Sequence, residues 1–159
     1  MRNYIAYFKY IIKHKWYIFK AAKQTKASLL RVLLHDLSKF LPSEWFAYMN
    51  TYYNKDGSKK KFKHNRAFDV AWTKHLERNK HHWQYWCINK EYNLCIQMPE
   101  EYIREMIADW IGAGLAINDK NDVQLWYKKN EFKIKLTPYS RKLVEQILEE
   151  INDFQEIKF

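Results

Sequence analysis

Glycine and proline are scarce in this chain, with only three of each among 159 residues. All-β proteins need these residues for their many tight turns, so the scarcity argues against that class. The length suits one domain, and a hydrophobic content of 47% is enough for a core that needs no cross-links. We therefore expect one all-α domain spanning residues 1–159, built as a compact bundle of about six or seven helices.

Cysteine is scarce as well, and its two copies are Cys87 and Cys95. Two cysteines are too few for a disulfide framework, and they lack the CxxC spacing of a zinc or redox centre. We therefore expect reduced thiols in a cytoplasmic protein. Long apolar runs are also missing near the N-terminus, where Lys, Arg and His interrupt the sequence too often for a signal peptide or a membrane span.

Positive charge dominates, because 28 Lys and Arg residues face only 18 Asp and Glu residues. The resulting net charge of +10 favours an anionic partner, such as a nucleotide, a nucleic acid or a membrane surface. Aromatic residues make up 18% of the chain and include seven tryptophans. This content suits either a dense core or surfaces that stack on nucleobases.

Apolar residues recur at helical spacing along the chain. In the first segment Ile5, Phe8, Ile11, Ile12 and Phe19 predict a surface helix with one buried face. Further helices are expected at residues 26–40, 42–53, 66–79, 99–117, 122–126 and 138–154. Residues 54–65 predict a solvated, lysine-rich loop, and residues 81–97 predict either an irregular segment or a short hairpin around residues 89–91.

Several potential metal ligands fall on the apolar faces of these helices. His14 follows Ile11 by three residues, and His75 follows Trp72 by three. Asp109 follows Met106 by three residues, so it too shares a face with apolar neighbours. A single histidine on such a face is often a hydrogen-bonded core residue. A buried carboxylate, in contrast, needs a cation or a proton, because its desolvation costs several kcal/mol.

The doublet His35-Asp36 directly follows the segment Leu29–Leu34, which is apolar except for Arg31. Asp36 needs a cation if it is buried, although helix-end capping or pairing with Lys39 offers an alternative. His81 and His82 add two imidazoles, and His82 shares the face of His75 if the helix continues through Asn79. A mixed set of nitrogen and oxygen ligands favours Mn, Fe, Co, Ni or Zn in a catalytic site.

The order His14, His35-Asp36 and Asp109 resembles the H…HD…D ligand order of the HD-domain metal-dependent phosphohydrolases. The context HDLSK and the later HH pair are most similar to the HD-GYP branch, although HHWQYW replaces its Gly-Tyr-Pro signature. The segments HDLSKF, HLERNKHHWQYW and MPEEYIREMIADW also resemble a small uncharacterised family of bacterial and phage proteins. The resemblance implies a helical bundle of the HD-domain type that forms one metal-binding domain.

The resemblance further implies one or two divalent transition metals. It assigns a first metal to four residues, with Asp36 as the bridge to any second metal: His14, His35, Asp36 and Asp109. Three further histidines would complete the second metal or contact phosphate: His75, His81 and His82. Asp36, Lys39 and His81 are the expected catalytic residues. Lys39, His75 and Trp83 are the expected substrate contacts.

Two further features have both a functional and a plain structural interpretation. Glu105, one turn before Asp109, either orients a ligand histidine or lies on the surface. The lysines of residues 59–63 either attract an anionic substrate to the mouth of the site or form an ordinary solvated loop.

Three functions follow as alternatives. The first is hydrolysis of a nucleotide or another small phosphorylated compound by water that a metal activates. The second is a basic helical module that binds nucleic acid without metal, with structural histidines. The third is a degenerate HD fold that binds a nucleotide without turnover. We expect no membrane partner.

Overall fold

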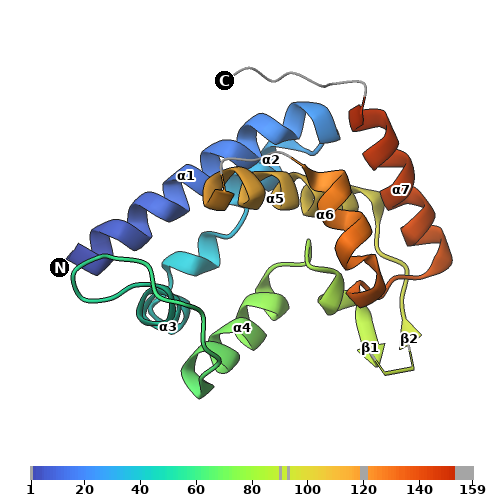
Figure 1. Ribbon diagram of the computed structural model, residues 1–159. Coiled ribbons are helices and arrows are strands. Elements are labelled where there is room, and N and C mark those ends of the chain that lie inside the picture. The colour runs from blue at the N-terminus through green and yellow to red at the C-terminus, as the bar shows by residue number, and fades with distance from the viewer. Residues whose placement is uncertain (1, 90, 93, 119–121, 153–159) are drawn as a thin grey trace.

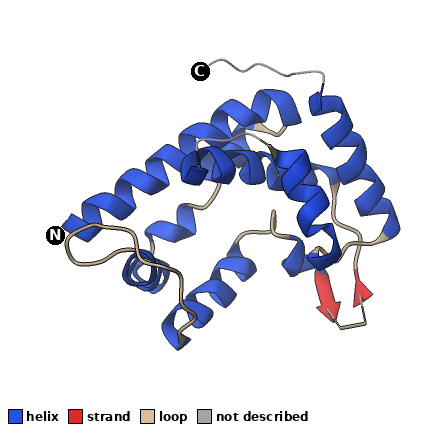
Figure 2. Ribbon diagram, in the orientation of Figure 1, coloured by secondary structure: helices blue, strands red, loops and turns tan. Residues whose placement is uncertain are grey.

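The computed structural model describes residues 2–89, 91–92, 94–118 and 122–152 (Figure 1). Helices account for most of this part of the chain, so the predicted all-α class is confirmed (Figure 2). The described α-helices are α1 (Arg2–Thr25), α2 (Leu29–Leu34), α3 (Pro42–Tyr52), α4 (Arg66–Arg78), α5 (Glu100–Asn118), α6 (Val123–Asn130) and α7 (Pro138–Asn152). Three short 3-10 helices are η1 (Leu37–Phe40), η2 (Trp83–Trp86) and η3 (Glu131–Lys133), and two strands are β1 (Cys87–Asn89) and β2 (Leu94–Cys95).

The helix starts follow the capping residues that the sequence supplies. Pro42 occupies the first turn of α3, where its missing N–H costs nothing. The side chain of Asn65 accepts a hydrogen bond from Phe68 N at the start of α4, and Asp122 accepts one from Leu125 N at the start of α6. These bonds satisfy amide groups that have no partner inside the helix.

The second helix is shorter than predicted, because α2 ends at Leu34 and does not continue through Asp36 to Leu41. Asp36 has a φ of 56°, in the left-handed region that an α-helix cannot contain. The Lys15 ammonium of α1 donates hydrogen bonds to the carbonyls of Leu33 and His35, at 3.1 and 2.6 Å. This lysine therefore satisfies the carbonyls that the early helix end leaves free.

The buried face of α1 differs from the predicted one. Its core residues are Tyr7, Ile11, His14, Ile18 and Ala21. The other residues predicted to share a face with Ile11 are largely exposed: Ile5, Phe8, Ile12 and Phe19. The helix carries two apolar stripes, and spacing alone does not show which of them meets the rest of the chain.

Two hydrophobic clusters divide the core along α1. Near the N-terminus, Tyr7 and Ile11 pack with Tyr48 of α3 and Phe68 of α4. Toward the C-terminal end of α1, Ile18 packs with residues of α5, α6 and α7. Figure 1 shows α1 and α5 side by side, with α3 and α4 near one end and α7 near the other. His14 lies between the two clusters, because it lies between Ile11 and Ile18 on the buried face.

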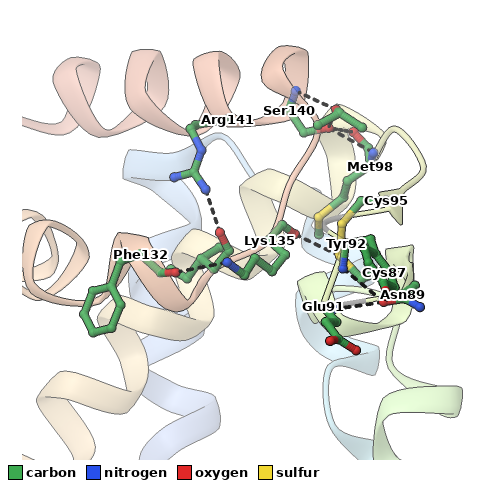
Figure 3. Close-up of a disulfide and its surroundings, with 12 residues drawn as sticks. Cys87, Asn89, Glu91, Tyr92, Cys95, Met98, Phe132, Lys135, Ser140 and Arg141 are labelled. Atoms are coloured by element: carbon green, nitrogen blue, oxygen red, sulfur yellow. Dashed lines mark hydrogen bonds between the residues drawn. A yellow bond between two sulfur atoms is a disulfide. The ribbon is translucent and has the colours of Figure 1, made fainter.

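The prediction of two reduced thiols is wrong, because Cys87 and Cys95 form a disulfide (Figure 3). Strands β1 and β2 pair as an antiparallel hairpin in which these two residues are direct partners, with Cα atoms 4.0 Å apart. The spacing along the sequence gave no sign of this pairing. The expected cytoplasmic location loses the support of free thiols, since stable disulfides are rare in reducing compartments.

Two other predictions include residues that lie outside the described part of the chain. The alternative of a hairpin at residues 89–91 is confirmed by the β1–β2 pairing, although Lys90 itself lies outside the described part of the chain. The apolar stripe of α7 is buried at Val144, Ile147, Leu148 and Ile151, while Phe154 lies outside the described residues.

Within the described helices, none combines the length and the hydropathy needed to cross a bilayer.

Candidate metal centre

Four of the predicted ligands converge where α1, α5 and the turn after α2 meet. His14 Nε2 lies 3.1 Å from Asp109 Oδ1 and 3.6 Å from Asp36 Oδ2. His35 Nε2 lies 3.2 Å from the same Asp36 oxygen and 3.4 Å from Asp109 Oδ1. The ligand atoms of these four residues all lie within 4.8 Å of one another, so a single ion fits among them.

A second group forms around the other oxygen of Asp36. His75, near the C-terminal end of α4, places Nε2 3.3 Å from Asp36 Oδ1. His81 places Nε2 3.6 Å from that oxygen. His82 Nε2 lies 2.9 Å from His75 Nε2, although α4 ends at Arg78. The chain turns after the end of α4, and this turn places His82 beside His75 although the two residues do not share a helix.

Asp36 belongs to both groups, and each of its oxygens faces a different set of imidazoles. The residue is 1% exposed, so bulk water does not solvate this carboxylate. Its left-handed backbone conformation places it at the tight turn between α2 and η1. Aspartate adopts this conformation more readily than most residues, which is one physical reason for its suitability at this position.

The donor atoms fit a metal because they make few other contacts, and the Lys39 ammonium beside Asp36 Oδ2 is a cation that a metal ion could replace. His14 Nε2, His35 Nε2, His81 Nε2 and both oxygens of Asp36 are buried and make no hydrogen bond within the described part of the chain. Unpaired polar atoms in a protein interior are costly, and metal ions held by the two groups would satisfy them. Imidazole nitrogen and carboxylate oxygen are ligands suited to first-row transition metals.

Glu105 is buried behind the histidines and does not lie on the surface. Its Oε1 lies 3.0 Å from His35 Nδ1 and 3.3 Å from His81 Nδ1. Each imidazole can therefore donate its Nδ1–H to Glu105 and keep Nε2 free for the centre. Glu105 contacts one histidine from each group, so it orients both.

Glu44 has the same function for His75, and the sequence did not reveal it. His75 Nδ1 lies 2.9 Å from Glu44 Oε2, and both side chains are fully buried. Ser38 Oγ and the guanidinium of Arg78 donate to the same carboxylate, at 2.9 and 2.6 Å. A glutamate in the first turn of α3 has the ordinary explanation of helix-dipole complementarity, so no sequence signal marks it as a site residue.

The titratable groups strongly perturb one another. Burial raises the pKa of Asp36, but His35, Lys39, His75 and His14 together outweigh burial and hold it well below its usual range. Burial lowers the pKa of His35, but the Asp36 carboxylate and bonds to Asp109 and Glu105 raise it well above its usual value. His35 and Lys39 thus stabilise the buried Asp36 carboxylate, a function that a divalent ion would take over.

A pocket of about 270 Å³ lies beside the centre. Tyr10 in its wall stacks on His14, with ring centroids 5.9 Å apart, and Trp72 stacks on His75 at 5.5 Å. Lys39 lines the same pocket and forms an ion pair with Asp36 Oδ2. The pocket is lined by Tyr7, Tyr10, Lys39, Tyr48, Tyr52, Tyr53, Lys59, Lys60, Trp72 and Ile117.

The structure therefore brings together all seven predicted metal ligands, with Lys39 beside them. Two lysines of the 59–63 loop, Lys59 and Lys60, reach the pocket. Trp83 does not belong to the lining residues, because it packs against the core around α5. Trp72 occupies the pocket wall instead, a position that its place on α4 one turn before His75 explains.

The chain matches the model of a family of unknown function, DUF5662, over residues 3–151. Since this match spans most of the sequence, the protein belongs to that family. No curated protein and no solved structure matches the chain. Function therefore has to be inferred from the residues of the site itself.

Proposed function

We propose that this protein is a metal-dependent phosphohydrolase of the HD-domain type that acts on a nucleotide or a related small phosphorylated compound. The observation that supports this most is the position of Asp36 between two groups of imidazoles. A carboxylate between two sites suits a pair of metals that together hold a phosphate and a water. The positively charged pocket next to this carboxylate suits an anionic substrate.

One or two ions of Mn, Fe, Co, Ni or Zn would be held by the residues that converge on Asp36. When bound, such an ion lowers the pKa of water and neutralises phosphate charge. In the overall reaction the oxygen of water forms a bond to phosphorus, the ester P–O bond breaks, and the released alcohol keeps one proton of that water. Asp36 and His81 would hold the centre in place, and Lys39 would provide a charge to a phosphate oxygen.

The first test is the metal content of purified protein, by elemental analysis, compared with His35→Ala and Asp36→Ala. Circular dichroism would confirm that both variants fold. We expect close to stoichiometric metal in the wild type and its loss in both variants. Hydrolysis of mono-, di- and triphosphate esters would then be assayed with each metal. Metal without turnover on any ester would favour a degenerate binding protein, and absence of metal after reconstitution would refute the proposal.

The basic charge keeps nucleic acid as the alternative partner. A net charge of +10 is compatible with phosphate-backbone binding. In that case binding would depend steeply on salt and would survive chelation of metal. The buried Nε2 atoms of His14, His35 and His81 make no hydrogen bond within the described residues, and they favour the enzyme, because a surface that binds nucleic acid has no need for them.

A further inference from the structure

Two tyrosines that line the pocket have buried hydroxyls without an explained partner. Tyr7 and Tyr48 are 2% and 4% exposed, and neither hydroxyl makes a hydrogen bond within the described residues. Both side chains line the pocket beside the metal centre. A buried hydroxyl without a partner is costly, so a polar ligand atom in this pocket would relieve the cost.

The charges around these hydroxyls indicate the sign of that ligand. The side chains that line the pocket include three ammonium groups and no carboxylate: Lys39, Lys59 and Lys60. Burial raises the pKa of Tyr7 and of Tyr48, so both remain neutral O–H donors at neutral pH. Donors and cations together favour an anion with several acceptor oxygens.

The remaining walls indicate the shape of the ligand. Tyr10, Tyr52 and Trp72 present aromatic rings, and Ile117 adds an apolar side chain. Such walls suit a flat ring system that can stack. The volume of about 270 Å³ lies below the range of about 300–1,000 Å³ that is typical for drug-sized ligands. The volume of the pocket thus suits one ring system and its phosphate.

We propose that Tyr7, Tyr48 and Lys39 bind the phosphate of a small monoester whose organic part is a single flat ring system, of the size of a mononucleotide. This inference rests on the proposed function, because it places that phosphate next to Asp36. Tyr7 and Tyr48 donate to phosphate oxygens that face away from the metal centre. The ring lies against Tyr10, Tyr52 and Trp72, and Lys59 and Lys60 lie at the pocket wall.

The test is calorimetric titration of metal-loaded protein with inorganic phosphate and with a nonhydrolysable phosphonate analogue of adenosine 5′-monophosphate. The variants are Tyr7→Phe and Tyr48→Phe, and Tyr139→Phe is the control because Tyr139 is exposed on α7. We expect each pocket variant to weaken phosphate binding roughly tenfold, as expected for one lost hydrogen bond to an anion. The control should bind as the wild type does.

Two further results separate this inference from a folding defect and from the proposed function. The pocket variants should retain their metal and melt no lower than the wild type, because phenylalanine removes an unpaired hydroxyl. The phosphonate should bind at least about tenfold more tightly than phosphate. Equal affinity would refute the ring subsite, and unchanged phosphate affinity in both variants would refute the tyrosine site even if the enzyme hydrolyses esters. Tyrosine-dependent binding without any hydrolysis would instead refute only the proposed activity.

Discussion

His75 and Glu44 form a fully buried pair in which Nδ1 of the imidazole lies 2.9 Å from a carboxylate oxygen. This contact fixes the ring so that Nε2 faces Asp36. Ion-pairing with Arg78 holds the carboxylate in place, at 2.6 Å. Glu44 therefore determines the geometry of the second group without being one of its ligands.

Glu44→Gln should weaken metal binding at the second group by about 10–100-fold, because the neutral amide no longer raises the basicity of His75. The first group should keep its affinity. Competition titration with a chromogenic chelator would measure both sites. Glu77→Gln is the matched control, since Glu77 lies exposed on the same helix as His75. Equal loss at both sites, or none, would contradict the proposed positioning.

The shared carboxylate predicts how the metal stoichiometry divides. His14→Ala and His82→Ala each alter one group, whereas Asp36→Ala removes a ligand from both. Of two bound equivalents, each histidine variant should lose one and the aspartate variant should lose both. Elemental analysis after dialysis measures this. An Asp36 variant that retains one full equivalent would show that the two groups do not share their carboxylate.

Much of this arrangement could be predicted from spacing alone. His14, His75 and Asp109 lie on apolar helical faces, and a polar residue on such a face must meet a partner when the helix packs. The left-handed turn at Asp36 was not visible, because aspartate is compatible with many conformations. The order of ligands thus follows from the sequence, while the sharing of Asp36 needs the fold.

Other parts of the site had no local signal. Glu44 resembles an ordinary first-turn acid, and Tyr7 and Tyr48 resemble ordinary core aromatics. Their functions depend on which atoms remain unpaired after packing, which only contacts between distant segments decide. Trp83 was chosen because it follows the HH pair, yet Trp72 lines the pocket, because proximity in sequence did not predict proximity in space.

Alkaline pH should destabilise the protein through its buried phenols. The pKa of Tyr7 and Tyr48 is raised in the folded state by burial, against about 10 in an unfolded chain. Below pH of about 10 both states keep these protons, so this contribution to stability is complete. Above it the unfolded chain loses protons that the folded chain retains, so the free energy of unfolding falls by up to about 1.4 kcal/mol per pH unit and phenol.

Urea unfolding at about pH 9 and about pH 11 would measure this slope. Tyr7→Phe and Tyr48→Phe should each make the decline shallower, because each removes one titrating group. Tyr139→Phe should leave it unchanged, since Tyr139 is exposed on the surface and not buried in the pocket. Identical slopes in all four proteins would show that the buried phenols ionise without unfolding.

Gly112 sets the distance between the two helices that carry His14 and Asp109. A Cβ atom at this position would lie 2.4 Å from Ile18 Cγ1 and 3.0 Å from Ile18 N, so a side chain would force α1 and α5 apart. Gly112→Ala should therefore lower stability by about 1–3 kcal/mol in spite of its better helix propensity. Gly114→Ala is the control, because Gly114 lines a surface pocket on the same helix.

The control should be neutral or stabilising by up to about 1 kcal/mol in urea unfolding. Ile18 lies one turn after His14, and Gly112 lies one turn after Asp109, so the same displacement reaches the metal ligands. We therefore expect Gly112→Ala to weaken metal binding at the first group, which contains His14 and Asp109. The second group should be less affected, because Asp36 is the one residue that it shares with the first. Full metal affinity together with lowered stability would show that the centre tolerates a change in helix spacing. In that case the positions of His14 and Asp109 would not depend on the packing of α1 against α5.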